Sequence, residues 1–312
     1  MTLLSIPLAR YEFRFKVTTP FARPDYAGSM LRGIFGHALK KITCIYPSAD
    51  CKDCTMYQTC TYPEIFETPP KAHKIQAFSQ IPNPYIIEPP PLGKHDYLAG
   101  EYLIFNMVLT GKALKQFSLV ILAMQQAFKT GVSRQNGSAD LDEVYLLDSE
   151  NNKQLIFSCR NETIQAHEQQ LLITLPNTNI SQAQLHFKTP LRIQQNSKPV
   201  RAKQLSARQL LVSLARRINL LNDFHNDQIL IQDFKALVAQ AETVTIEHGL
   251  KWHDWIRYSN RQQQKMRLGG LIGEVALFGD LTEFYPLLYL GQWLHLGKNA
   301  TFGLGGYELT VN

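Results

Sequence analysis

The second half of the chain alternates between the hydrophobic spacing of strands and that of helices. Apolar residues recur every three or four positions over 204–222 and again over 281–296, which predicts two helices. Extended segments are predicted at 185–193, 243–256, 269–279 and 307–311. The order strand, helix, strand, strand, helix, strand is the βαββαβ plan of a ferredoxin-like (RRM-like) domain, an antiparallel sheet with helices on one face. A further helix over about 228–241 is predicted as an addition.

The first half repeats this plan more loosely. We predict strands at 8–18 and 101–109, helices at 28–43 and 112–130, and a hairpin of 143–148 with 154–158. An insertion over about 44–98 is rich first in cysteine and then in proline, and we expect neither regular helix nor sheet within it. The predicted fold class is therefore α+β, with two ferredoxin-like domains in tandem over 1–178 and 179–312.

Length and composition fit two ordinary globular domains. The chain has 312 residues, of which 45% are hydrophobic and 19% charged, so each half can bury a core. No apolar run approaches the roughly 18 residues of a membrane span, and the apolar N-terminus reaches Arg10 too soon for a signal peptide. We expect no membrane association and a cytoplasmic location. Five cysteines, four of them close together, fit a reducing compartment better than a disulfide framework.

Positive charge is concentrated in two tracts that lack acidic residues. No Asp or Glu occurs between Gln169 and Asn222, whereas 186–217 contains eight Lys or Arg. A second acid-free stretch carries Arg257, Arg261 and Arg267. A solvated basic helix face explains either tract alone, but both together, in a chain of net charge +6, favour a polyanionic partner.

A glycine-rich segment, GKNATFGLGG at 297–306, lies between the last predicted helix and the last strand. Its four glycines and Lys298 indicate either close approach of a phosphate-bearing ligand to bare backbone or a tight turn that needs glycine. Walker and Rossmann loops are excluded, because a Walker loop ends in Gly-Lys-Ser/Thr and a Rossmann loop leads from a strand into a helix.

The helix at 28–43 places an unusual set of residues opposite its apolar stripe. At 100° per residue, one face carries Leu31, Ile34, Phe35, Ala38, Leu39 and Ile42, and the other carries Gly33, Gly36, His37 and Lys40. Because glycine is a poor helix former, this second face is predicted to be thinned so that another backbone can approach an imidazole and an ammonium. A surface histidine on an ordinary amphipathic helix is the alternative.

Several segments together resemble a known family. GSMLRGIFGHAL, FKTPLRI, WHDWIRYSNRQ, GGLIGEV and GQWLHLGKNATFGLGGYEL are similar to the CRISPR-associated endoribonucleases of the RAMP superfamily, which cut precursor CRISPR RNA within its repeats. The resemblance spans nearly the whole chain. It implies metal-independent cleavage, in which a ribose 2′-hydroxyl attacks the adjacent phosphate and leaves a 2′,3′-cyclic phosphate and a 5′-hydroxyl. It also implies that the protein's partner is CRISPR repeat RNA within the precursor crRNA.

The resemblance assigns roles to particular residues. His37 matches the family's catalytic histidine by position, with Tyr26 and either Lys40 or Lys41 as helpers. An imidazole can exchange protons near neutral pH, and a cation can stabilise the charged phosphorane. His295, beside the glycine-rich segment, is the second choice. The alternative is a non-catalytic RAMP subunit that holds RNA within a CRISPR effector complex.

The predicted RNA-binding residues combine the basic tracts, the glycine-rich segment and the first helix. They are Arg32, Lys41, Arg192, Arg201, Lys203, Arg257, Arg261, Arg267, Gly297, Lys298, Gly303 and Gly305. Trp252, Trp255 and Tyr258 could stack on unpaired bases, although core packing is expected for at least one tryptophan.

The cysteines of the insertion have the spacing of a metal site. Cys44, Cys51, Cys54 and Cys60 form C-x6-C-x2-C-x5-C, and four thiolates can surround one tetrahedral ion. We predict a structural zinc, or an iron–sulfur cluster, that folds the insertion. Four thiolate ligands leave no open position, so catalysis by this metal is not expected and no cofactor is predicted for the reaction itself.

Overall fold

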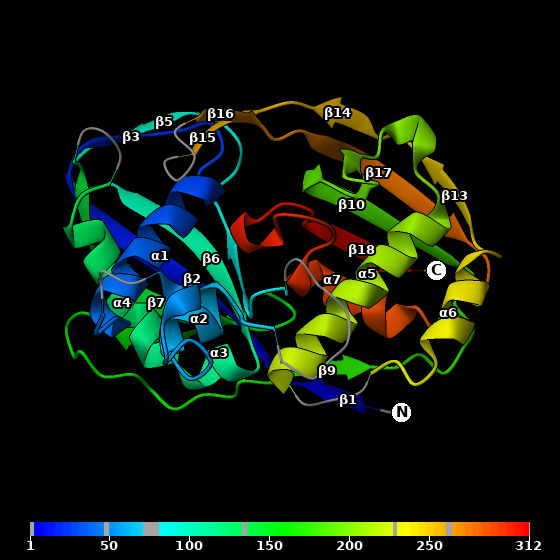
Figure 1. The fold of residues 1–312 in the computed structure, drawn as a ribbon, viewed down its shortest axis with the longest axis horizontal. Coiled ribbons are helices and arrows are strands. Elements are labelled where there is room, and N and C mark those ends of the chain that lie inside the picture. Colours follow the sequence, from blue (N-terminus) through cyan, green and yellow to red (C-terminus); the bar gives the residue numbers. More distant parts are fainter. Residues whose placement is uncertain are drawn as a thin grey trace. The chain divides into compact units, whose positions relative to one another are not determined.

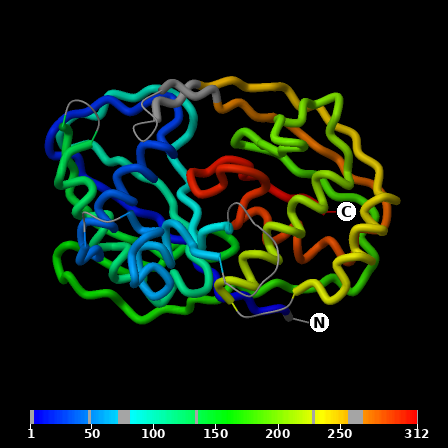
Figure 2. Tube along the Cα trace, in the orientation of Figure 1, coloured from blue at the N-terminus to red at the C-terminus, as the bar shows by residue number. Residues whose placement is uncertain are grey.

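The computed structural model describes residues 3–46, 50–70, 81–132, 136–226, 230–259 and 264–311. The chain divides into two compact units. We call Pro7–Leu171 with Phe224–Asn226 the N-terminal unit, and Met1–Ile6, Leu172–Asp223 and Asp227–Asn312 the C-terminal unit. Figure 1 labels their elements, and Figure 2 traces the backbone from the blue N-terminus to the red C-terminus.

The N-terminal unit is built on one antiparallel sheet with strand order β4-β6-β2-β7-β8. The strands are β2 (Leu8–Thr19), β4 (Tyr85–Glu88), β6 (Tyr102–Thr110), β7 (Ser138–Leu147) and β8 (Lys153–Ser158). Helices α1 (Gly28–Thr43) and α4 (Phe117–Lys129) pack against each other (Figure 1). Alternate residues of β2, among them Tyr11, Phe13 and Phe15, are fully buried in the core that these helices share.

The insertion predicted to lack regular structure contains both a helix and a strand. Helix α2 (Thr61–Phe66) and strand β4 lie within it, and β4 pairs with β6 as an outermost strand of the sheet. Its Tyr85, Ile86 and Ile87 are fully buried. The prolines on either side do not prevent this, because an edge strand needs ladder hydrogen bonds on one side only and four proline-free residues are enough. The expectation for 44–98 was therefore wrong on this point.

Shorter elements complete the N-terminal unit. Helix α3 (Lys112–Lys115) precedes α4, and β3 (Phe21–Arg23) pairs with β5 (His95–Tyr97). Phe224–Asn226, the last three residues of a π-helix at Asn222–Asn226, are the residues of this unit that come from later in the chain. There the His225 ring lies 2.9 Å from the Pro82 carbonyl.

The C-terminal unit has the antiparallel strand order β13-β17-β10-β18. Its strands are β10 (Gln182–Leu191), β13 (Thr245–His248), β17 (Gly270–Phe278) and β18 (Tyr307–Val311), and β14 (Lys251–His253) also pairs with β17. Its helices are α5 (Ala207–Leu221), α6 (Phe234–Ala241) and α7 (Tyr285–Leu294). Further two-stranded pairs are β1 (Leu3–Ile6) with β9 (Leu171–Thr174), β11 (Gln194–Gln195) with β12 (Lys198–Pro199), and β15 (Ile256–Ser259) with β16 (Gln264–Arg267).

The side chains of strand β10 alternate between the two faces of the C-terminal sheet. Its Ala183, Leu185 and Phe187 are fully buried, while Gln184 and His186 are exposed. Helices α5 and α7 contact each other and α7 contacts β18, which gives the buried face its cover. Helix α5 begins at a capping box in which the Ser206 hydroxyl accepts from the Gln209 amide. No helix in the described ranges combines the length and the apolar run that a bilayer crossing requires.

Candidate nucleic-acid interface

Helix α1 presents His37 to solvent. The side chain is exposed, and within the described residues it forms no hydrogen bond or ion pair. Gly33, one turn earlier, is also exposed, and a Cβ added there would meet nothing within 4 Å. This part of the helix therefore offers an accessible imidazole beside open space, as the sequence predicts.

Gly36 does not share that open face, contrary to prediction. It is buried, and a Cβ on it would lie 2.1 Å from Cζ of Phe66 in helix α2. The same ring receives the guanidinium of Arg32, whose Cζ lies 4.2 Å from the ring centroid. Gly36 thus accommodates Phe66 rather than a ligand backbone, and Arg32 is engaged on the protein's own aromatic ring.

The proposed helpers of His37 differ in accessibility. Tyr26 is only 4% exposed, and burial raises its pKa well above the ordinary value. Lys40 is half-buried, with its ammonium 5.8 Å from the Tyr62 ring centroid. Lys41 is exposed. The two lysines are therefore better placed than Tyr26 to meet an anion from solvent.

The structure does not assemble the four cysteines into a metal site. Within the described part of the chain, which includes all four, no group of three or more His, Cys, Asp or Glu residues is arranged to hold a metal ion. Cys44 follows α1 and Cys60 precedes α2, with a 3-10 turn at Cys51–Asp53 between them. Cys51 and Cys60 pack against the hydrophobic core, and burial raises the pKa of the Cys51 thiol. The arrangement of the described residues therefore does not support the predicted zinc or iron–sulfur cluster.

The glycine-rich segment folds back on the protein's own backbone. Gly297, Gly303 and Gly305 have φ of 89°, 91° and 75°, a region that favours glycine. A Cβ on Gly305 would lie 1.8 Å from the Leu296 carbonyl oxygen, and one on Gly297 would lie 2.5 Å from that of Arg192. Gly303 and Gly305 are buried. The turn interpretation therefore accounts for these glycines, and the accessible part of the segment is its start, where Lys298 is exposed.

Two side chains from outside the segment hold it in place. The Thr189 hydroxyl donates to the Gly303 carbonyl at 2.6 Å and accepts from the Gly306 amide at 2.8 Å. Arg217 of α5 donates from Nε to the carbonyls of Leu294 and His295, at 2.9 and 3.0 Å, where α7 ends.

His295, the second choice for catalysis, is 3% exposed, and its Nδ1 lies 3.3 Å from the Leu304 carbonyl. Its position inside the fold makes it a packing residue.

Some cations of the basic tract 186–217 bind groups of the protein itself, and others form no ion pair with a described residue. Lys188 pairs with Glu308, and Arg208 Nε lies 3.0 Å from Glu242 Oε1. Arg217 donates hydrogen bonds to the backbone carbonyls at the end of α7. The remaining exposed cations form no ion pair with any described residue; they are Lys198, Arg201, Lys203 and Arg216.

Four of the predicted RNA-binding residues lie together, and we call Arg192, Arg201, Lys203 and Lys298 the basic cluster. Arg192 Nη1 donates to the Gly269 carbonyl at 2.7 Å, and the Arg192 carbonyl accepts from the Lys298 amide at 2.8 Å. Burial lowers the pKa of Arg192, and the charge of Arg201 lowers it further. Lys203 lies in the 3-10 turn Ala202–Gln204 that follows Arg201. Cations gathered on adjoining segments in this way favour a polyanion.

Three other predicted residues lie in or beside the hairpin of β15 and β16. Arg257 and Arg267 lie on β15 and β16, where Ile256 pairs with Arg267. Arg261 lies outside the described residues.

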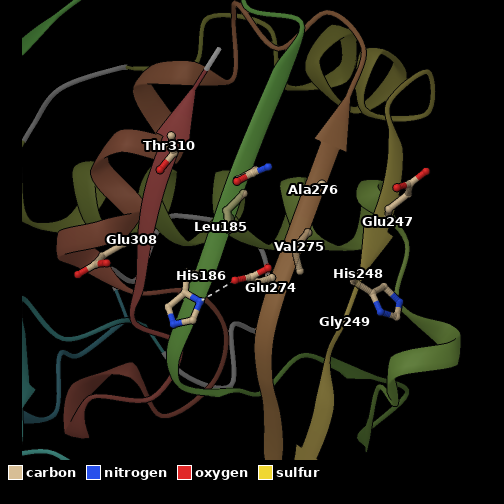
Figure 3. A pocket seen from close by; sticks show the side chains of 11 residues that line it. Leu185, His186, Glu247, His248, Gly249, Glu274, Val275, Ala276, Glu308 and Thr310 are labelled. Carbon is tan, nitrogen blue, oxygen red and sulfur yellow. Dashed lines mark ion pairs between the residues drawn. The ribbon is translucent and has the colours of Figure 1, made fainter.

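The exposed face of the C-terminal sheet carries acidic residues, unlike the basic cluster. A hollow of about 490 Å³ lies there, lined by residues of β10, β13, β17 and β18. Figure 3 shows the side chains that line it. Glu247, Glu274 and Glu308 all line it, and His186 lies 3.6 Å from Glu274. Glu308 is paired with Lys188, and the other two carboxylates, Glu247 and Glu274, make this face less suited to phosphates than the basic cluster.

Two family models match different parts of the chain. Residues 4–169 match the AF_1859_N family model, described as an N-terminal domain, and residues 185–307 match the model of the CRISPR-associated endoribonuclease Cas6. No curated protein matches the sequence.

Solved structures share the fold at low identity. Thermus thermophilus Cas6 (TTHB231), in a product complex, aligns at a TM-score of 0.60 and 15% identity over 97% of this chain and 99% of its own. A Cas6 (TTHA0078) product complex aligns at 0.52 and 14%, over 98% of this chain and 100% of its own. A Cas6-RT-Cas1–Cas2 complex aligns at 0.56 and 16%, over 98% of this chain but 46% of its own. The two family models together span most of the sequence: the Cas6 model covers residues 185–307, and the likeness to the solved Cas6 structures over the whole chain shows a shared fold.

Proposed function

We propose that the protein binds CRISPR repeat RNA and cleaves precursor crRNA within the repeat without using a metal ion. The observation that carries the proposal is the exposed imidazole of His37 on α1, which forms no hydrogen bond or ion pair with any described residue, in a chain whose residues 185–307 match the Cas6 model. The alternative histidine, His295, is 3% exposed. Solved relatives in product complexes support RNA as the ligand.

In the proposed reaction the ribose 2′-hydroxyl loses its proton as its oxygen attacks the adjacent phosphate. The bond from phosphorus to the 5′-oxygen of the next nucleotide breaks, and that oxygen is protonated. The products are a 2′,3′-cyclic phosphate and a 5′-hydroxyl. His37 transfers one of these protons, and Lys40 or Lys41 offsets the added negative charge of the phosphorane. Tyr26 supports the start of α1 from within the core rather than exchanging a proton.

The RNA-binding role falls to the basic cluster. Its exposed members Arg201, Lys203 and Lys298 lack a carboxylate partner among the described residues. Arg192 and the glycines Gly297, Gly303 and Gly305 act indirectly, because they shape the backbone that presents Lys298. Lys41, Arg257, Arg261 and Arg267 are retained as further contacts, whereas Arg32 is assigned to packing on Phe66.

The strand orders of both units support a ferredoxin-like description. In each, the first strand of the βαββαβ series lies between the third and the fourth, and the second strand is at the edge next to the third. We retain the division into domains near residue 178. We also propose a cytoplasmic site of action, where array transcripts are made.

A non-catalytic RAMP subunit within a CRISPR effector complex is the competing function, because the basic cluster serves both. Incubation of the protein with its own array's repeat RNA in EDTA separates the two. The proposal predicts cleavage in EDTA and none when the nucleotide at the cut carries a 2′-deoxyribose, since the nucleophile is then missing. Binding without cleavage of any repeat would favour the subunit, and loss of cleavage on metal removal would contradict the metal-free mechanism.

A further inference from the structure

Arg201 lies flat on an indole ring at the edge of the basic cluster. Its guanidinium carbon is 3.6 Å from the centroid of the Trp252 ring. This separation is the contact thickness of two planar groups, so the guanidinium and the indole face each other. Arg201 is exposed whereas Trp252 is half-buried, so the arginine is the solvent-facing member of the stack.

Both members of this stack are fixed by their surroundings. The Trp252 Nε1 donates to Asp254 Oδ1 at 2.8 Å, and the ring rests on Gly269, where a Cβ would lie 2.4 Å from it. The backbone of Arg201 is held by Gln204, whose side chain accepts from the Arg201 amide at 3.1 Å. An ordered planar surface loses little conformational entropy when a ligand covers it.

Arg201 forms no ion pair with a carboxylate of the described residues. Arg208, in the same basic tract, differs in this respect because it pairs with Glu242. Gly269, beneath the indole, also binds Arg192 through its carbonyl, and Arg192 adjoins Lys298. The stacking surface is therefore continuous with the cations that attract phosphates.

Resting on the RNA-binding role proposed above, we propose that Arg201 and Trp252 form a nucleobase subsite. An unpaired base of the RNA stacks on the outer face of the Arg201 guanidinium, giving the order base, guanidinium, indole. Unpaired bases stack on arginine planes as well as on aromatic rings. A purine covers the guanidinium more fully than a pyrimidine, so adenine or guanine is the preferred occupant. Lys203 and Lys298 contact the neighbouring phosphates.

The test separates stacking from simple charge attraction. The probes are an oligoadenylate of about twelve nucleotides and an abasic ribose-phosphate oligomer of equal length and charge. The wild-type protein should bind the oligoadenylate about 5- to 150-fold more tightly, the range that base stacking contributes. Arg201→Lys keeps the charge and removes the plane, so it should lose most of this preference while its affinity for the abasic oligomer stays near wild type. Arg208→Lys is the matched control and should keep the preference.

Two outcomes would overturn the subsite. One is a wild-type protein that binds both oligomers equally, and the other is an Arg201→Lys variant with an undiminished preference for bases. Neither readout uses cleavage, so an inactive protein that still discriminates bases in this way would contradict the proposed reaction and leave the subsite standing.

Discussion

Gly36 lies directly beneath the Phe66 ring, so that a single methyl group on this glycine would overlap it at 2.1 Å. The ring cannot turn away freely, because it is stacked on Tyr62 and Tyr85 and covered by Arg32. The contact fixes α2 on α1.

Substitution of the two glycines of α1 should have opposite effects on stability. Gly36→Ala must displace Phe66 and should destabilise the N-terminal unit by about 1–3 kcal/mol, the usual effect of overpacking. Gly33→Ala places its methyl group in open space and should stabilise the helix by up to about 1 kcal/mol. Thermal unfolding of both variants checks this. A Gly36→Ala protein as stable as wild type would show that Phe66 is not held as described.

The glycine-rich segment should be sensitive to a change that adds no charge. Gly305→Ala combines φ of 75° with a Cβ at 1.8 Å from the Leu296 carbonyl oxygen, so the segment must unfold locally or shift. We expect a lower melting temperature together with weaker RNA binding. Lys298→Ala should leave the melting temperature unchanged. Equal melting temperatures for both variants would contradict the internal role of Gly305.

The basic cluster should appear in the salt dependence of RNA binding. Lys203→Ala and Lys298→Ala should each lower the affinity for repeat RNA and reduce the slope of log affinity against log salt by about 0.7, because one phosphate contact is lost. Arg208→Gln, which removes a cation already paired with Glu242, should leave the slope unchanged. Filter binding at several salt concentrations measures all three. A wild-type slope for both lysine variants would place the RNA elsewhere.

Glu12 gives the N-terminal unit a defined pH dependence. Burial raises its pKa, but hydrogen bonds from Lys153 and Arg14 outweigh burial and hold the pKa below the ordinary value. Its contribution is therefore present above the unfolded-state pKa, about 4.3, and is lost as the pH falls through the folded-state value. Glu12→Gln should cost about 1–3 kcal/mol at neutral pH. Melting curves of both proteins should converge in acid, and a constant difference down to low pH would contradict this account.

The sequence predicts elements well where burial follows one clear period. Helix α1 has the predicted bounds, 28–43, because its apolar stripe and the lack of proline allow one assignment. Strand β4 was missed because the prolines around it mask a four-residue run whose role depends on pairing with β6. Periodicity in the sequence contains no information on such a partner.

The sequence predicts which residues form the basic cluster, but it does not predict the contacts that hold the site together. Clustering of Arg192, Arg201 and Lys298 brings together residues that the acid-free tract and the glycine-rich segment indicate separately. The engagement of Gly36 with Phe66 and of Arg217 with the end of α7 could not be predicted, because each depends on a contact between distant segments. Cysteine spacing alone likewise cannot show whether the thiols converge.

The most direct test of the central claim is the single-turnover rate of repeat cleavage by His37→Ala, measured with RNA affinity. His37 is exposed on α1 and forms no hydrogen bond or ion pair with any described residue, so the variant should fold and bind RNA as wild type does. Its cleavage rate should fall about 100- to 10,000-fold, the usual contribution of a proton-transferring group. His295→Ala should instead lower the melting temperature, because that side chain is buried. Cleavage by His37→Ala at the wild-type rate would contradict the account.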